Sequence, residues 1–183
     1  MSTRLAARHL GWMLAVMLFA GVSPVMEGQA LEVQQSTGFV EVLLPDLGWR
    51  QAVLGRQLPP DAVVTSWLGA GTRLTYGGSV VTLGSFSHLR IVSVGKELVS
   101  LSLQAGAVTV ETSTPPCEIE FRGLTVRLEQ GSVTLTDGAL KVLTGTAVVK
   151  GAQDQPLTFG PGSTFSLLTQ PSGPVFEVDK SLQ

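Results

Sequence analysis

The chain has 183 residues, a formal net charge of −2 and a charged fraction of only 14%. This length fits one domain with at most a short tail, and the cations are scattered singly, which argues against nucleic-acid binding because such binding needs clustered contacts to phosphates. Gly is abundant, and Val, Thr, Leu and Ser dominate after residue 30, a composition that suits half-buried β strands. The composition therefore favours a single β domain, and we expect it to use no cofactor.

The first 30 residues form a separate segment. Arg4 and Arg8 precede the apolar run Leu10–Val22, and small residues around Ala30 end the segment. A membrane-spanning helix needs roughly 20 apolar residues, so the shorter run here predicts a helical signal peptide. Cleavage would leave a mature chain beginning at Leu31 in the periplasm or outside the cell. An uncleaved N-terminal membrane anchor is the alternative.

Beyond the leader, apolar and polar residues alternate in short runs that Gly, Pro or Asp interrupts, the pattern of strands joined by tight turns. We expect a loose mature N-terminal lead over 31–38, a β domain over 39–170, and a C-terminal strand and tail over 171–183. The pair Gly77-Gly78 between two alternating runs predicts a hairpin. The predicted strands cover 39–43, 49–52, 62–67, 72–76, 79–83, 88–94, 97–103, 107–111, 117–121, 124–128, 132–136, 139–143, 146–149, 158–159, 163–168 and 175–178.

These strands predict an all-β fold of many short antiparallel strands, arranged as a solenoid-like or sandwich stack. Alternation gives each strand an inward and an outward face. In the run from 124 to 128, it places Leu124, Val126 and Leu128 inward, with Thr125 and Arg127 outward.

A set of Trp, Gly and alternating apolar residues between 40 and 168 has a characteristic order and spacing. Its members are Trp49, Ala52, Gly55, Leu58, Pro60, Asp61, Val64, Thr65, Leu74, Gly78, Ser79, Val81, Leu83, Leu89, Ile91, Leu101, Leu103, Gly106, Val108, Val110 and the stretch 124–133. This pattern resembles the FecR-like domain family. The chain departs from it at Pro59-Pro60-Asp61, where the family has Pro-Gly-Asp, and at Gly77-Gly78-Ser79, where it has Asp-Gly-Ser. The family's Arg-Gly-Thr-x-Phe stretch appears here as Thr144-Gly145-Thr146-x-Val148.

The resemblance implies a domain for protein contacts. Well-known members are transmembrane regulators with a cytoplasmic helical domain that acts on a sigma factor. Their periplasmic part senses an outer-membrane TonB-dependent receptor. Only nine residues precede the apolar run here, too few for a folded anti-sigma domain. The resemblance therefore implies an exported, stand-alone β domain, with cell-envelope signalling as one possible role.

The sequence offers no clear catalytic set. His88 is the one histidine beyond the leader, and Ser85 and Ser87 lie beside it. A hydrolytic triad needs an oriented base and a nucleophile on a sharp turn, and the chain has no Gly-x-Ser-x-Gly motif. We therefore expect His88 to be a strand-end surface residue and the protein not to be an enzyme.

Metal binding is also not expected. Glu118 and Glu120 share one strand face, but calcium needs six or more oxygen ligands, and paired outward carboxylates are ordinarily solvated. The single cysteine, Cys117, has no partner for an internal disulfide. Its simplest interpretation is a small buried residue at the start of a strand, and a reactive thiol is the alternative.

The candidate partner-binding residues are Trp67 and the final strand, with Val175, Phe176 and Val178. Aromatic side chains are enriched in binding hot spots, and an exposed strand edge can accept a partner strand. Trp49, within the family pattern, is expected in the core. The first alternative to a domain that binds a protein or envelope component is a carbohydrate-binding protein or an envelope hydrolase with a site built from loops. The second alternative is a regulator that an uncleaved leader anchors in the membrane.

Overall fold

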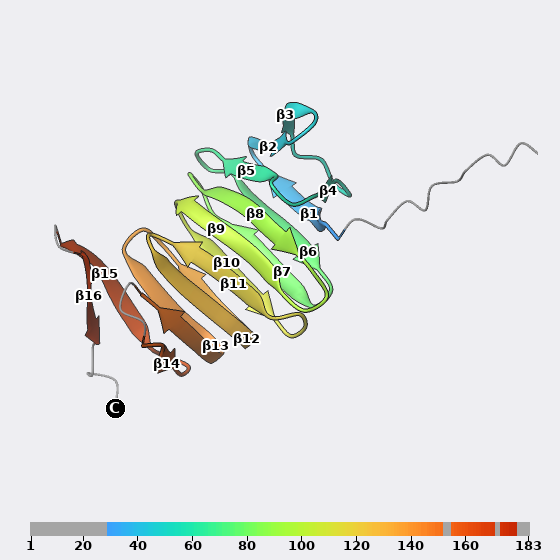
Figure 1. Ribbon diagram of the computed structural model, residues 1–183. Helices are drawn as coiled ribbons and strands as arrows, with labels where there is room; N and C mark the ends of the chain where they lie inside the picture. The colour runs from blue at the N-terminus through green and yellow to red at the C-terminus, as the bar shows by residue number, and fades with distance from the viewer. Residues whose placement is uncertain (1–28, 152–154, 171–172, 179–183) are drawn as a thin grey trace, which may run out of the picture.

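The computed structural model describes residues 29–151, 155–170 and 173–178, and every regular element in them is a β strand. The strands are β1 (Leu31–Thr37), β2 (Val40–Leu44), β3 (Gly48–Gln51), β4 (Gln57–Leu58), β5 (Val63–Ser66), β6 (Gly71–Tyr76), β7 (Ser79–Leu83), β8 (His88–Val94), β9 (Val99–Ala105), β10 (Val108–Thr112), β11 (Cys117–Phe121), β12 (Leu124–Leu135), β13 (Ala139–Lys150), β14 (Leu157–Phe159), β15 (Thr164–Gln170) and β16 (Gly173–Val178) (Figure 1). The all-β prediction is confirmed, whereas the predicted signal-peptide helix lies outside the described residues. In the described part of the chain, no helix could cross a membrane.

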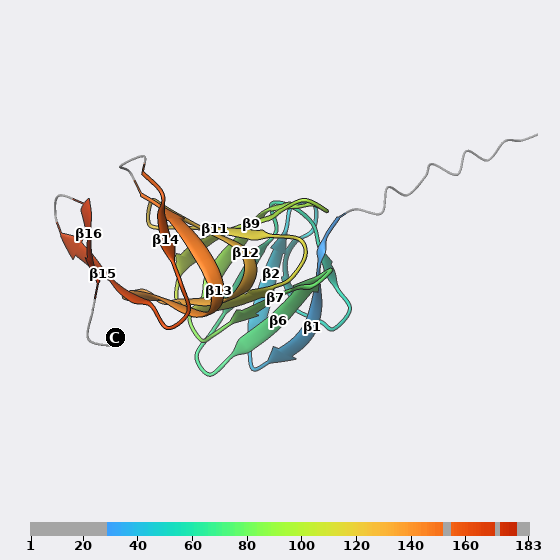
Figure 2. The same cartoon turned by 90° about the horizontal axis from the view of Figure 1, so that it is seen from below.

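The strands form one sheet that curls into two layers. The first layer runs β3-β2-β5-β8-β9-β11, and the second runs β4-β1-β6-β7-β10. The long strand β12 joins the layers because its first half pairs with β11 and its second half with β10. Figure 2 shows β9 and β11 on one side of the curled sheet and β6 and β7 on the other. The core lies between the layers, where alternation buries every second side chain.

The predicted inward and outward faces are confirmed where the sequence alternates most regularly. Leu124, Val126 and Leu128 are at most 2% exposed, whereas Thr125 and Arg127 face outward. Burying such a side chain is worth about 1.5–3 kcal/mol. A shift in register by one residue would expose the whole set, so burial fixes the register of β12.

Two expectations about strand arrangement need correction. Residues 31–38 do not form a loose lead, because β1 pairs with β4 and β6 and its side chains Leu31 and Val33 are fully buried. The strands are also not all antiparallel. β9 and β11 pair in parallel, with Val99 beside Cys117, because the chain passes through β10 in the second layer before it returns.

Gly131 and Gly145 allow β12 and β13 to bend from one layer to the other. The sequence predicts four short strands here, but the structure has two strands of 12 residues that continue through both glycines. The two residues are Cα partners and have φ angles of 127° and 75°. A Cβ on Gly145 would overlap the carbonyl oxygen of Gln130 and lie 2.9 Å from Gly131 Cα. Glycine at this corner thus lets both strands belong to both layers.

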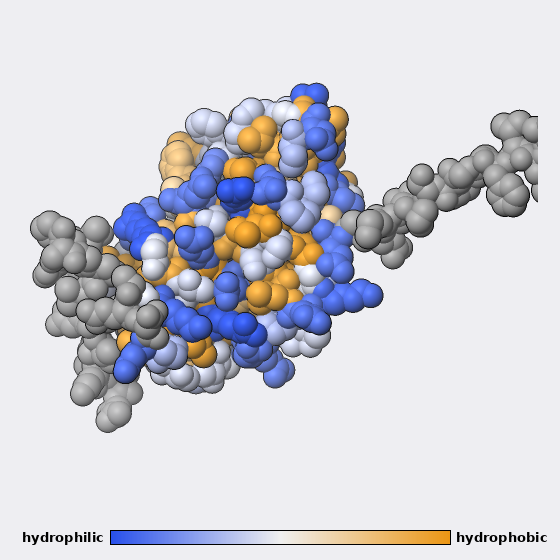
Figure 3. Space-filling model, in the orientation of Figure 1, coloured by the Kyte–Doolittle hydropathy of each residue, from blue (hydrophilic) through white to orange (hydrophobic). Residues whose placement is uncertain are grey.

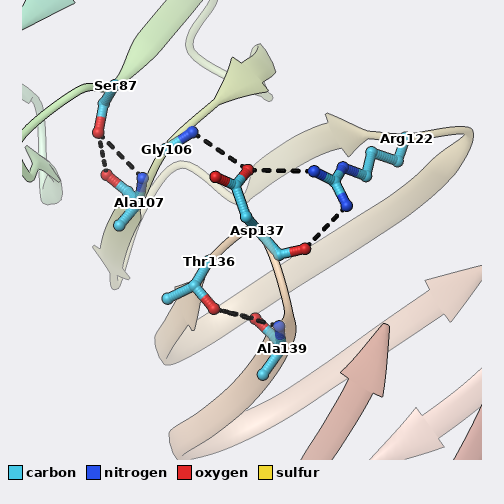
Figure 4. A network of polar contacts seen from close by, with 7 residues as sticks. All are labelled: Ser87, Gly106, Ala107, Arg122, Thr136, Asp137 and Ala139. Carbon is cyan, nitrogen blue, oxygen red and sulfur yellow. Dashed lines mark hydrogen bonds and ion pairs between the residues drawn. The ribbon is translucent and has the colours of Figure 1, made fainter. Parts of the chain in front are cut away.

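Hydrogen bonds join the connections at one end of the strands to each other (Figure 4). Ser87 Oγ donates to the Ala107 carbonyl (2.8 Å) and accepts from the Ala107 N–H (3.0 Å). The Gly106 N–H donates to Asp137 Oδ1, and Arg122 donates to both the carbonyl and the carboxylate of Asp137. These bonds connect the turns that follow β7, β9, β11 and β12. Side chains as well as strand pairing therefore stabilise this end of the sheet.

Candidate functional site

Large exposed apolar side chains gather at the N-terminal end of the sheet. Of the 11 found in the described residues, seven lie on β2, β3, β5 or the connections next to them, an eighth precedes β8, which pairs with β5, and three lie elsewhere. The eight are Phe39, Leu47, Trp49, Val53, Leu54, Trp67, Leu68 and Phe86. Single exposed apolar residues are ordinary on a soluble protein, but their concentration at one end is typical of an interaction surface.

Phe39 and Trp67 form an exposed aromatic pair at this end. Their ring centroids lie 6.3 Å apart, and the side chains are 51% and 48% exposed. The Trp67 backbone N–H donates to the Phe39 carbonyl (3.1 Å), and Trp67 Nε1 donates to a carboxylate oxygen of Glu41 (3.0 Å). The polar edge of the indole is therefore satisfied, which leaves its apolar faces for a partner.

Phe86 extends this pair across a third segment. Thr65 lies opposite His88 in the antiparallel β5–β8 pair, and the Ser66 N–H donates to the Ser87 carbonyl at 2.9 Å, so the connections that carry Trp67 and Phe86 lie next to each other. Phe86 is 59% exposed and has a φ of +54°, a left-handed conformation that is strained for a bulky residue. Strain of this kind persists only where the surroundings impose it, and it is concentrated at functional sites. We call Phe39, Trp67 and Phe86 the aromatic row.

A polar row separates the aromatic row from a second apolar row on the same face. Glu41, Thr65 and His88 are register partners on β2, β5 and β8, and the Thr65 hydroxyl is hydrogen-bonded to His88 Nδ1 at 2.8 Å. The next row on this face contains Leu43 and Val63. Figure 3 shows the resulting mixture of orange apolar and blue polar residues on this side of the molecule.

The structure gives His88 no serine partner among the described residues. Its hydrogen-bonded neighbour is Thr65, whereas Ser85 Oγ donates to the Ala70 carbonyl and Ser87 Oγ donates to the Ala107 carbonyl. The two serines next to His88 in sequence are therefore held away from it by the connections that they stabilise.

Glu118 and Glu120 lie on the outer face of β11, and the structure places them beside β12. Their Cα partners there are Arg127 and Thr125. In the described ranges, no three His, Cys, Asp or Glu side chains converge as metal ligands.

Cys117 is fully buried at the start of β11. Burial in apolar surroundings, and to a lesser degree the charge of Glu118, raises the pKa of the thiol to about 12. Because the thiolate is the reactive form, this environment makes the side chain inert.

We therefore expect Cys117 to resist a thiol-labelling reagent at pH 8 while the protein is folded. With a pKa of about 12, roughly one thiol in ten thousand is ionised at that pH. Labelling should become complete in denaturant, which serves as the internal control. Rapid stoichiometric labelling of the folded chain would contradict the burial.

The remaining sequence-predicted partner residues lie in β16. This strand pairs with β15, with Val175 opposite Leu168, Phe176 opposite Leu167, and Val178 opposite Phe165. The side chains of β16 lie outside what the structure describes, and the strands do not bring β16 into a pair with β2, β3 or β5. Trp67 and β16 are therefore separate candidates.

A shallow groove of about 590 Å³ is a feature that sequence reasoning missed. It lies where β7, β10, β12 and β13 meet. Its lining residues are Gly78, Val80, Glu111, Thr112, Ser113, Gln130, Gly131, Ser132, Leu143 and Thr144. No aromatic side chain lines it, and its residues come from segments whose pairing alternation alone does not reveal.

Comparison with known proteins bears on the fold. No family model and no curated protein matches the sequence. Two crystal structures of a candidate anti-sigma factor from Parabacteroides distasonis, at 1.65 and 2.50 Å resolution, are similar, with TM-scores of 0.55 and 0.54 and identities of 14% and 15%. Each match covers 64% of this chain and 58% of the solved chain, so this chain spans less than two thirds of their length. The likeness shows a shared fold.

Proposed function

We propose that this chain is an exported, non-enzymatic FecR-like domain that docks a partner protein through the aromatic row, in cell-envelope signalling. The observation that carries the proposal is the exposed Phe39–Trp67 pair, fixed by backbone and side-chain hydrogen bonds. Rigid aromatic side chains supply much contact area at low entropic cost, which is why they dominate binding hot spots.

Two further observations support the proposal. The fold is shared with a candidate anti-sigma factor, and proteins of that name act by binding another protein. The leader sequence, with Arg4 and Arg8 ahead of Leu10–Val22, supports export to the periplasm or beyond.

The carbohydrate-binding or hydrolase alternative has less support. Sugar recognition commonly uses an aromatic face within a concave site, but the 590 Å³ groove is lined by none. His88 is bonded to Thr65, and the hydroxyls of Ser85 and Ser87 have carbonyl partners. No observation specifically favours this second function.

Photo-crosslinking in the native host tests the proposed function. A crosslinking amino acid replaces Leu68, which is 77% exposed and follows Trp67, or Leu157, a 44% exposed control on β14. We expect position 68 to crosslink to one discrete protein, and this product should disappear when Trp67→Ala is added. Position 157 should not crosslink to that protein. Identical products from both positions, or none from position 68, would contradict docking at the aromatic row.

Sequencing the N-terminus of the mature protein tests export. We expect Leu31 as the first residue. A chain that retains the apolar run and fractionates with membranes would replace the cleaved leader with the anchored alternative.

A further inference from the structure

β3 ends the first layer and has a free edge in the described structure. β3 pairs with β2, and no other described strand pairs with it. The Ala52 N–H donates to the Val40 carbonyl at 2.9 Å, which identifies Val40 and Ala52 as a hydrogen-bonded pair. Hydrogen-bonded and non-hydrogen-bonded pairs alternate along antiparallel strands. The backbone groups of Trp49 and Gln51 therefore point away from β2, toward the free edge.

This edge lacks two of the usual protections against another strand. Natural edges are commonly very short, or are blocked by charged side chains, Pro or a bulge, and β3 is short but has no Pro and no register shift against β2. β3 has the sequence Gly-Trp-Arg-Gln, and its one charged residue, Arg50, donates from NH1 to the Trp49 carbonyl at 2.9 Å. The guanidinium covers one carbonyl of the edge and leaves the N–H groups of Trp49 and Gln51 and the Gln51 carbonyl free to pair.

An apolar row on the outer face leads up to the same edge. Trp49 lies opposite Leu43 on β2, and Leu43 lies opposite Val63 on β5. Trp49 is 46% exposed, while Leu43 and Val63 are half-buried. A strand added to β3 would place one side chain directly beside the indole, because register partners lie on the same face.

From this arrangement we infer that β3 accepts an extended segment of a partner protein, in which an apolar residue beside Trp49 alternates with an acidic residue beside Arg50. The inference rests on the proposed function, since it describes how a docked partner continues the first layer. The acidic side chain pairs with the Arg50 guanidinium and draws it from the Trp49 carbonyl. That carbonyl then becomes available as a further acceptor for the added strand.

A second copy of the chain fits this edge less well. Two β3 strands could pair in a symmetric antiparallel way through the free backbone groups of Trp49 and Gln51. In that pair, Arg50 of one copy lies directly opposite Arg50 of the other. Like charges in that position destabilise a strand pair. The charge on β3 thus favours an acidic-apolar segment over self-association.

Selection from a displayed library of random 12-residue peptides tests the inference. Peptides selected on the purified protein should share alternating apolar and acidic residues. Gln51→Pro removes the free N–H and should weaken their binding at least about tenfold, whereas Gln51→Ala keeps the N–H and should bind as the wild type. Should Gln51→Pro fail to fold, Trp49→Glu should give the same loss, because it removes the apolar side chain and repels the acidic one.

Other outcomes overturn the inference in ways that can be told apart. Peptides that bind Gln51→Pro as well as Gln51→Ala, or a selection that enriches nothing, would exclude strand addition at β3. Peptides whose binding is weakened only by Trp67→Ala would bind at the aromatic row. That result would support the proposed function and contradict the β3 inference. Failure of the otherwise wild-type protein to form any crosslink from position 68, by contrast, would remove the proposed function without altering the peptide selection.

Discussion

Replacing Gly145 with alanine is expected to destabilise the protein by about 3 kcal/mol or more, enough to unfold much of a marginally stable chain. The φ of Gly145 is +75°, and an added Cβ would overlap the Gln130 carbonyl and crowd Gly131 Cα. The backbone of β12 would have to move, and with it the pairing that joins the two layers. Urea unfolding, followed by tryptophan fluorescence, measures the loss.

Gly138→Ala is the matched control. Gly138 lies in the connection between β12 and β13, its φ is not positive, and an added Cβ would meet nothing within 4 Å. Its unfolding midpoint should therefore stay close to that of the wild type, within about 0.5 kcal/mol. Equal midpoints for Gly145→Ala and Gly138→Ala would show that the corner does not depend on glycine.

Phe121→Ala should cost about 3–5 kcal/mol, the second large effect that we expect. Phe121 is 1% exposed at the end of β11, among the largest fully buried side chains of the core. Truncation removes its apolar burial and leaves a cavity between layers that have little freedom to close around it. Thermal and urea unfolding of the purified variant measure the change.

Phe39→Ala makes the same chemical change on the surface. Phe39 is 51% exposed, so its removal should change the free energy of unfolding by less than about 1 kcal/mol. The difference between the two variants measures burial rather than the loss of a phenyl ring. Similar destabilisation by both would mean that Phe121 is not buried in the core as described.

Sequence alternation predicts most strands correctly because burial follows the same period of two. Cys117–Phe121, Ser79–Leu83 and His88–Val94 are strands with the predicted bounds. The pattern fails where a strand changes layer. Gly131 and Gly145 resemble turn residues in sequence, but they permit a bend inside continuous strands, which only the register of β12 with β13 reveals.

β1 and Trp49 show why position in the sheet cannot be inferred from local pattern. β1 begins with buried Leu31 and Val33, but polar residues follow, so the segment resembles a loose lead although β6 pairs along it. Trp49 is expected in the core from the family resemblance, yet it is 46% exposed. It lies on the terminal strand of the first layer, where no described strand covers its outer face.

The candidate site could be predicted only in part. Trp67 is identifiable from sequence as an aromatic residue beside a turn, but its neighbours in the aromatic row come from other connections. Phe39 precedes β2, and Phe86 lies before β8 in a left-handed conformation. Their proximity depends on strand pairing between distant segments, which alternation does not specify.

The most direct test of docking at the aromatic row is the affinity between this protein and the partner that is crosslinked at position 68. Titration of the purified partner should show about 30-fold weaker binding to Trp67→Ala than to the wild type, the loss typical of a hot-spot residue. Leu157→Ala, on β14, which pairs with β13, should bind as the wild type does. Equal affinities for Trp67→Ala and Leu157→Ala would mean that the aromatic row does not form the docking surface.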